Sequence, residues 1–239
     1  MDKQLEHADT CIPWHYKVRR SARAKRIKLS FASSTGLELV LPRRASLQDG
    51  LAFMLTQQDW IQSLADRHQV DLQSPPEAPP IPESILLKAT GEHFAVVRGS
   101  RLGLLERKNE LVLKATPEQA PLLLQRWMLF KGKQVLLPWL AACSLRTGLP
   151  YQSAGVRNQS SRWGSYSSRG AVSLNCRLLL LEPEQVEYVL LHELSHSAHM
   201  NHSPDFWQLL ESVCDNARAL DRSVDLAARQ VPEWISYKP

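Results

Sequence analysis

Residues 191–207, LHELSHSAHMNHSPDFW, contain four of the eight histidines of the chain within eleven residues. On an α-helix, residues four apart lie one above the other, so the imidazoles of His192 and His196 can reach one cation. Glu193 then lies beside them, within reach of a water on that cation, and zinc suits this H-E-x-x-H pattern. Apolar residues at helical spacing predict that the same helix packs into a core: Val186, Val189, Leu190 and Leu194. The segment therefore requires a buried helix that carries a metal site.

The third ligand of such a site is either His199 or His202. Seven residues of helix separate His192 from His199, about 10.5 Å along the axis, which is too far for both to bind one ion beside His196. Asn201 tolerates the left-handed conformation that ends helices, and Ser-Pro-Asp at 203–205 starts a new one. We therefore expect the helix to break between His199 and Asn201, and His202 to complete the site.

The spacing of His196 and His202 also fits the longer H-E-x-x-H-x-x-G-x-x-H pattern of the metzincins. In this chain His199 occupies the glycine position, and no methionine follows Met200 to supply the downstream turn of that group. The sequence therefore disfavours a metzincin.

The first third of the chain is typical of a small β-rich region. Alternating apolar residues predict a β-hairpin over 27–41 that ends at Pro42, and helical spacing predicts one helix from Ser46 to His68. Five prolines in 71–84 predict a stiff linker, because proline sustains neither a helix nor a central strand. We expect an N-terminal region, 1–84, and a catalytic domain, 85–239, with a soft boundary; one compact unit is the alternative.

The rest of the chain alternates strand and helix patterns. Short runs at 93–97, 102–106 and 110–113 predict a small antiparallel sheet, and a long helix follows to Gly148 with a kink at Pro138. Turn residues at 167–170 predict a second hairpin within 153–175. The fold class is therefore α+β with antiparallel hairpins and a buried histidine helix.

Composition limits where the chain works and what it binds. The longest apolar runs are too short to span a membrane, and the N-terminus lacks a secretory profile, so we expect a cytoplasmic protein without membrane contact. Four scattered cysteines predict reduced thiols. The net charge of +5 is concentrated in a basic face that is accompanied only by Glu38. Its members are Lys17, Arg19, Arg20, Arg23, Lys25, Arg26, Lys28, Arg43 and Arg44. It is either a site for nucleic acid or another polyanion, or a solvated strand edge.

Four segments of the chain match one known family. They are 16–29 (YKVRRSARAKRIKL), 161–167 (SRWGSYS), 172–175 (VSLN) and 187–207 (EYVLLHELSHSAHMNHSPDFW). In them the chain resembles the YgjP-like zinc metallopeptidases, relatives of the SprT and WLM groups in the zincin clan. That family usually reads W-G-S-C-S, and here Tyr166 stands at the cysteine position, which removes a thiol from that place.

The resemblance implies a zincin-like catalytic domain with His192, His196 and His202 on one zinc ion per chain and Glu193 as the general base. The chemistry of these residues agrees, because zinc lowers the pKa of a bound water to about 7 and Glu193 can take its proton. The hairpin around 162–167 offers an edge strand to a peptide, with Arg162 or Tyr166 placed to stabilise the oxyanion.

The sequence thus predicts a zinc metallopeptidase that hydrolyses peptide bonds in a peptide or protein substrate. One alternative is a metal-dependent nucleotide phosphohydrolase, although three neutral histidines suit carbonyl hydrolysis better than the oxygen-rich sites that magnesium prefers. The other alternative is a nucleic-acid-binding module with structural zinc. The open coordination position and Glu193 disfavour that module.

Overall fold

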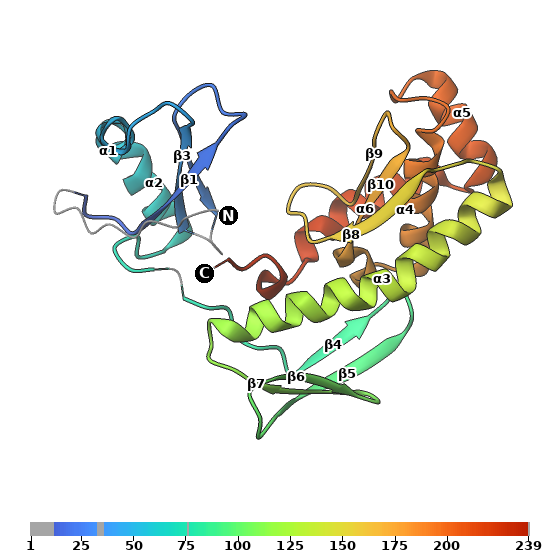
Figure 1. Cartoon of the computed structure of the whole chain (residues 1–239), viewed down its shortest axis with the longest axis horizontal. Coiled ribbons are helices and arrows are strands. Elements are labelled where there is room, and N and C mark those ends of the chain that lie inside the picture. Colours follow the sequence, from blue (N-terminus) through green and yellow to red (C-terminus); the bar gives the residue numbers. More distant parts are fainter. Residues whose placement is uncertain (1–11, 33–35, 76, 239) are drawn as a thin grey trace. The chain divides into compact units, whose positions relative to one another are not determined.

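The computed structural model describes residues 12–32, 36–75 and 77–238, which fall into two compact units. Unit 1 comprises the described residues of Met1–Pro79 and Tyr237–Pro239, and unit 2 is Pro80–Ser236. Across the described residues there are six α-helices and three small mixed sheets, so the fold is of the α+β class (Figure 1).

Unit 1 contains a three-stranded sheet in the order β1-β3-β2, with β3 parallel to β1 and antiparallel to β2. The strands are β1 (Tyr16–Ser21), β2 (Lys28–Ala32) and β3 (Gly36–Pro42). Leu37, Leu39 and Leu41 alternate along β3 and are fully buried. Side chains two residues apart on a strand lie on the same face of the sheet. These leucines therefore form the surface that the helices of unit 1 cover.

The single helix expected from Ser46 to His68 is wrong, because two helices occupy this stretch. They are α1 (Leu47–Thr56) and α2 (Gln58–His68), and at Gln57 the N–H bonds to the Met54 carbonyl three residues back. The break lets each helix cover a different part of β3. Met54 of α1 packs with Leu39 and Leu41, and α2 packs with Leu37.

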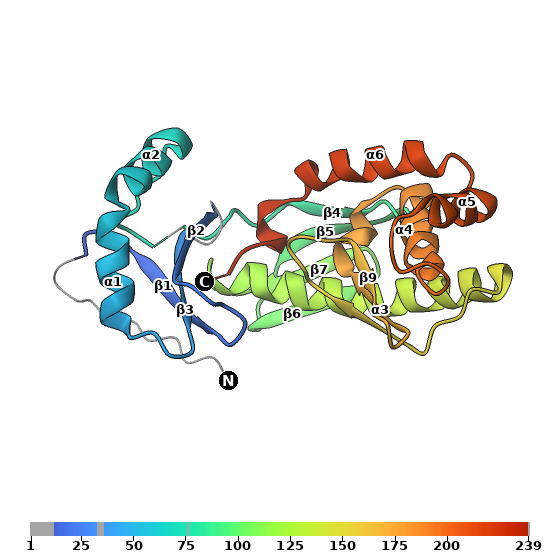
Figure 2. The same ribbon diagram turned by 90° about the horizontal axis from the view of Figure 1, so that it is seen from above.

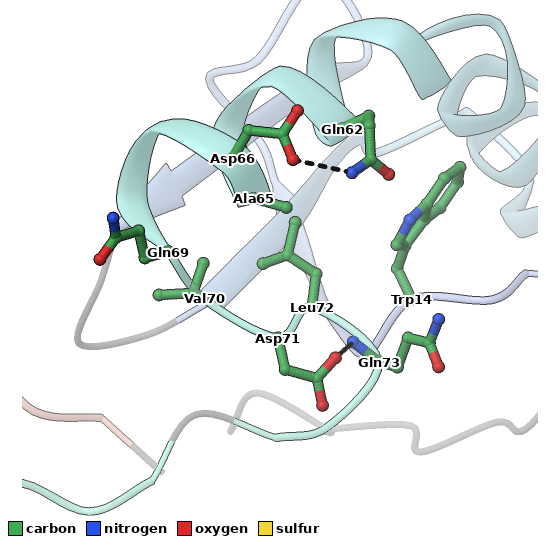
Figure 3. A pocket seen from close by; sticks show the side chains of 9 residues that line it. All are labelled: Trp14, Gln62, Ala65, Asp66, Gln69, Val70, Asp71, Leu72 and Gln73. Atoms are coloured by element: carbon green, nitrogen blue, oxygen red, sulfur yellow. Dashed lines mark hydrogen bonds between the residues drawn. The ribbon is translucent and has the colours of Figure 1, made fainter.

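Unit 1 also has a pocket, at the end of α2 and the turn that follows it (Figure 3). Trp14 lies to one side, and the other lining residues include Asp66, next to Gln62, and Asp71, next to Gln73. Asp66 accepts a hydrogen bond from Gln62 at 3.0 Å, and Asp71 accepts one from the Gln73 N–H at 2.8 Å. No histidine or cysteine is among the described residues that line this pocket, so it does not resemble a zinc site.

Unit 2 begins with a four-stranded sheet in the order β4-β5-β7-β6. Its strands are β4 (Ser84–Leu87), β5 (Glu92–Arg98), β6 (Gly103–Arg107) and β7 (Glu110–Lys114). The expectation of a purely antiparallel sheet is wrong, because β5 and β7 pair in parallel. The β6–β7 hairpin docks through its second strand, which places β7 between β5 and β6 and leaves β6 at the edge.

The long helix α3 (Gln119–Thr147) lies between this sheet and the remaining elements of unit 2 (Figure 1). It continues through Pro138 and ends at Gly148, whose left-handed φ of 73° lets its N–H bond to the Ser144 carbonyl at 2.9 Å. Leu124, Met128 and other apolar residues of α3 belong to one core that includes residues of both unit 2 sheets.

The second sheet of unit 2 has the order β8-β10-β9. Its strands are β8 (Ser153–Arg157), β9 (Gly164–Tyr166) and β10 (Ala171–Asn175), with β10 antiparallel to β9 and parallel to β8. Strand β9 is therefore an edge strand. The chain continues through η1 (Cys176–Leu180), α4 (Pro183–Ser195), α5 (Pro204–Val213), α6 (Ala217–Ala227), η2 (Ala228–Gln230) and η3 (Glu233–Ile235).

Three cysteines, Cys143, Cys176 and Cys214, are free and buried, and Cys11 lies outside the described residues. Burial raises the pKa of Cys143 to about 11 and that of Cys176 to about 12, so both remain neutral thiols. Within the described ranges, none of the helices combines the length and the apolar character needed to cross a bilayer.

Candidate metal centre

Helix α4 carries the histidine motif into the core of unit 2. Its N-terminus is fixed by Pro183 in the first turn and by a capping box between Glu182 and Gln185. Its apolar side chains are buried in the core of unit 2. The helix itself packs against α3, α5 and α6 (Figure 2). The packing places His192 and Glu193 in the last turn of the helix, where Glu193 is buried and His192 is partly exposed.

Regular helix ends at Ser195, earlier than the break expected between His199 and Asn201. The next N–H groups bond three residues back: Ser197 to the Leu194 carbonyl at 2.9 Å, and Ala198 to the Ser195 carbonyl at 3.1 Å. Such bonds tighten the last turn of a helix. The His199 N–H still bonds four residues back, to the Ser195 carbonyl at 3.1 Å, so helical turns run on to His199 although regular helix ends earlier than expected. Ser203 then caps α5, because its hydroxyl accepts from the Phe206 N–H.

The tight turn brings three imidazoles together. One ring nitrogen from each of His192, His196 and His202 lies within 4.8 Å of the other two, and Nε2 of His202 lies 3.1 Å from Nε2 of His192. Two nitrogens on a tetrahedral zinc lie about 3.3 Å apart, given Zn–N distances of about 2.0–2.1 Å. The donor set therefore fits a zinc ion with an open fourth position. His199 contributes its backbone, not its ring, to this arrangement.

Hydrogen bonds at the opposite ring nitrogen orient two of the histidines. Nδ1 of His196 lies 2.9 Å from the His199 carbonyl oxygen, so it carries the proton and leaves the Nε2 lone pair unprotonated. Nδ1 of His192 lies 3.2 Å from the hydroxyl of Tyr188. That hydroxyl donates its single proton to Asp221 at 2.6 Å, so Nδ1 of His192 must donate to it.

Burial and the neighbouring imidazoles of His196 and His202 lower the pKa of His192 to about 4. The pKa of His196 is also lowered, mainly by burial. Both rings are therefore neutral near pH 7, as metal ligands must be.

Glu193 is the buried acid of the site, with 6% of its surface exposed. Burial raises its pKa to about 7, against the opposing effects of the Arg162 charge and of a hydrogen bond from the Tyr166 backbone N–H. A pKa near the working pH suits a general base. Its carboxylate lies against Gly164, where a Cβ atom would stand 2.5 Å from Oε1.

Of the two predicted substrate-binding residues, Arg162 lies two residues before β9 and Tyr166 is the last residue of β9. The side chain of Arg162 is exposed, and its charge acts on Glu193. The hydroxyl of Tyr166 donates to the Pro150 carbonyl at 3.1 Å, so this side chain is directed away from Glu193, toward which its backbone N–H points. Sequence reasoning missed Gly164, Tyr188 and Asp221. Only Tyr188 had a signal, four residues before His192 on the same helix face.

The basic face lies in unit 1, on β1, β2 and the segments between and after the strands. Arg19 pairs with Glu38 at 2.9 Å, Arg20 donates to the Ala45 carbonyl at 2.9 Å, and Lys17 donates to the Lys238 carbonyl at 2.6 Å. These contacts hold three of the cations in backbone or ion-pair interactions. Binding of nucleic acid by this face stays a prediction.

Three histidines and a buried glutamate around one helix end of unit 2 form an arrangement that suits a metal-dependent hydrolase. The chain belongs to the YgjP-like family, since the family's metallopeptidase domain matches residues 25–226. The resemblance seen in the sequence is thus confirmed. No curated protein matches the chain.

Two solved structures are similar to part of the chain. The metallopeptidase zymogen of Pyrococcus abyssi abylysin is 23% identical with a TM-score of 0.36, over 40% of this chain and 96% of that one. The metallopeptidase zymogen of Methanocaldococcus jannaschii jannalysin is 15% identical with a TM-score of 0.35, over 40% of this chain and 97% of that one. At this level of similarity neither structure determines how this chain works.

Proposed function

We propose that the chain is a zinc-dependent metallopeptidase in which Glu193 activates the attacking water. His192, His196 and His202 would hold the zinc, since their ring nitrogens converge within 4.8 Å. Three neutral imidazoles suit zinc better than magnesium, which prefers oxygen ligands. When bound, zinc would lower the pKa of a water ligand toward about 7 and polarise the substrate carbonyl.

The observation that carries the proposal is the state of Glu193. Its carboxylate is buried next to the histidine cluster and its pKa is about 7, so it can both accept and return a proton near neutral pH. In the proposed reaction it takes the proton of the attacking water and later passes it to the leaving amine. The Tyr166 N–H and Arg162 orient the carboxylate for these transfers.

Strand β9 would bind the peptide. The Trp163 carbonyl accepts from the Asn175 N–H, and the Ser167 N–H donates to the Ala171 carbonyl. Backbone groups alternate in direction along a strand, so the N–H and C=O groups of Gly164 and Tyr166 point away from β10. An extended peptide can pair with such an edge. In this arrangement Tyr166 would offer its carbonyl to the peptide, because its N–H is bonded to Glu193. Arg162 would be the charged group that stabilises the developing oxyanion.

The test combines metal analysis with hydrolysis of a peptide library by the purified chain. We expect one zinc per chain and cleavage that is lost with chelator and restored by zinc. Glu193→Gln should retain zinc and lower hydrolysis by about a hundredfold or more, the usual scale for a lost general base. Glu184→Gln, at an exposed position on the same helix, is the matched control and should retain activity.

Unchanged turnover in Glu193→Gln would show that this carboxylate is not the base. Zinc-dependent hydrolysis of nucleoside triphosphates without peptide cleavage would replace the peptidase proposal with the phosphohydrolase. Zinc that remains bound in a chain inactive on both substrates would favour the structural role.

A further inference from the structure

A polar pocket lies between the segment that leads into β9 and the helix α6. Its lining consists of residues 159–163, Asn175, Arg177, Asp225, Ala228 and Val231. Its volume is about 170 Å³, several times the roughly 30 Å³ that one water occupies in the liquid. The pocket therefore has room for one amino-acid side chain, and nothing in the proposed function has yet used it.

Two residues of the pocket wall are close in sequence to residues of the catalytic site. Trp163, in its wall, directly precedes Gly164, against which the carboxylate of Glu193 lies. Asp225 follows Asp221 by one turn of α6, and Asp221 bonds to the hydroxyl that orients His192. The pocket thus lies at the approach to β9, whose first residue contacts the carboxylate of Glu193.

The most unusual wall residue is Arg177, which is only 7% exposed. Its Nε donates to Asn158 Oδ1 at 3.0 Å and its Nη2 to the Ile235 carbonyl at 3.4 Å, and both acceptors are neutral. Among the described residues, no carboxylate lies within ion-pair distance of this guanidinium. Burial lowers its pKa, which reflects the free-energy cost of holding a cation away from water. A buried cation without a counter-ion calls for an anion from elsewhere.

Two other residues that line the pocket also favour an anionic, hydrogen-bonding ligand. The Oε1 atom of Gln159 is buried and, within the described part of the chain, has no hydrogen-bond partner, so it can accept an N–H from a ligand. Arg162 brings a second guanidinium, and its side chain is exposed. Arg162 and Arg177 against Asp225 leave one positive charge in excess in the lining.

We propose that this pocket is a subsite for a carboxylate of the substrate, held by Arg177 and Arg162. Gln159 accepts the peptide N–H of the residue that brings the carboxylate. The inference rests on the proposed peptidase function and names a preference within it. The carboxylate comes either from an aspartate or glutamate side chain or from the C-terminus of the peptide, and the two sources share the same recognition chemistry.

The first test uses three matched peptides, designed on the most selective position found in the library digest. The first peptide has Glu at this position and an amidated C-terminus. The second has Gln at this position and the same amidated C-terminus. The third ends with Gln at this position, so that its free C-terminal carboxylate lies there. We expect kcat/KM to be about tenfold or more higher for one of the carboxylate peptides than for the amidated Gln peptide, as for charge-assisted hydrogen bonds. The better peptide identifies the source.

Variants assign the preference to the pocket. Arg177→Gln and Arg162→Gln should each reduce the ratio of kcat/KM between the preferred peptide and the amidated Gln peptide, and Arg177→Lys should keep part of it. Arg169→Gln, at an exposed arginine in the β9–β10 turn, is the control and should keep the full ratio. Because Arg177 is buried, Arg162→Gln provides the test if Arg177→Gln does not fold.

A binding measurement on the full chain makes the test independent of catalysis. The arginine Nε–H resonances are followed by NMR during titration with acetyl-Ala-Glu-amide, acetyl-Ala-Gln-amide and acetyl-Ala-Ala, and Arg177→Lys identifies the signal of Arg177. We expect that signal to move only with a peptide that has a carboxylate. Equal responses to all three peptides, or none, overturn the subsite.

Cleavage that is indifferent to carboxylates overturns the subsite and leaves the peptidase proposal intact. Absence of all cleavage contradicts the peptidase proposal, and the NMR titration then decides the subsite alone. A preference that survives both Arg177→Gln and Arg162→Gln belongs to another part of the chain and also overturns the inference.

Discussion

The carboxylate of Glu193 lies so close to the backbone of Gly164 that a Cβ atom on this glycine would stand 2.5 Å from Oε1 and 2.7 Å from Cγ. Only a residue without a side chain leaves this space to the carboxylate. Contact with Gly164 and the hydrogen bond from the Tyr166 N–H together hold Glu193 beside the histidine cluster. Strand β9 and the Glu193 carboxylate thus fix each other's position.

Gly164→Ala should displace the Glu193 carboxylate and lower peptide hydrolysis by about a hundredfold, because small misplacements of a catalytic group cost about that much. Zinc affinity should change little, since the three histidines that would hold the zinc are unaltered. Gly155→Ala is the matched control on strand β8, where a Cβ atom meets nothing within 4 Å. Equal activities of the two variants would show that the contact has no catalytic role.

Tyr188→Phe should weaken zinc binding by about 10- to 100-fold, the range for residues that orient a metal ligand. The change removes the hydroxyl that bonds to both Asp221 and His192 and leaves the ring in the core. Competitive chelator titration measures the effect. NMR of the metal-free chain provides a second readout, because His192 should lose its fixed Nδ1–H tautomer. Tyr151→Phe, at a partly buried tyrosine, is the control, and a similar loss there would contradict the role of Tyr188.

His202→Ala should reduce zinc affinity severely, because two histidines do not complete a stable coordination shell. His199→Ala should reduce it much less, since His199 bonds to His196 through its carbonyl oxygen, which alanine retains. Chelator titration of the two variants separates these roles. If His199→Ala lost as much affinity as His202→Ala, the ligand assignment would be wrong.

The pH dependence of the free energy of unfolding of the metal-free chain should reveal the raised pKa of Glu193. Its pKa is about 7 in the folded chain, above its ordinary value of 4.5, so the folded state holds the proton more tightly than the unfolded state does. This contribution to stability is complete below about pH 4.5 and is lost as the pH rises to about 7.

Urea denaturation from pH 4 to 8 should therefore show wild type losing stability relative to Glu193→Gln as the pH rises through this window. The comparison separates Glu193 from His192, which both proteins contain. Glu184→Gln, exposed on the same helix, should follow wild type throughout. A difference between wild type and Glu193→Gln that stays constant with pH would rule out the raised pKa.

Much of the local structure follows from short-range pattern. The four-residue spacing of His192 and His196 predicts that they share a helix face, and their ring centroids lie 5.1 Å apart. Ser203 before Pro204 predicts a helix start, and Ser203 caps α5. These features depend on residues within one or two turns of each other, so the sequence contains all that decides them.

Tertiary packing decided the features that the sequence left open or predicted wrongly. The expected helix over 46–68 divides at Gln57 because α1 and α2 cover different parts of β3. The parallel pairing of β5 with β7 follows from how the β6–β7 hairpin docks. Neither choice changes the local hydrophobic pattern, so that pattern could not distinguish between the alternatives.

The sequence by itself determined the class of site: its histidines, its glutamate and the helix that carries them. Only the tertiary structure decided how they are oriented and what surrounds them. Tyr188 reaches Asp221 across 33 residues of chain, and Arg177 reaches Ile235 across 58. Local propensity does not encode such pairs, because the free energy that joins them comes from burying the whole core, and each pair forms only when its elements have already packed.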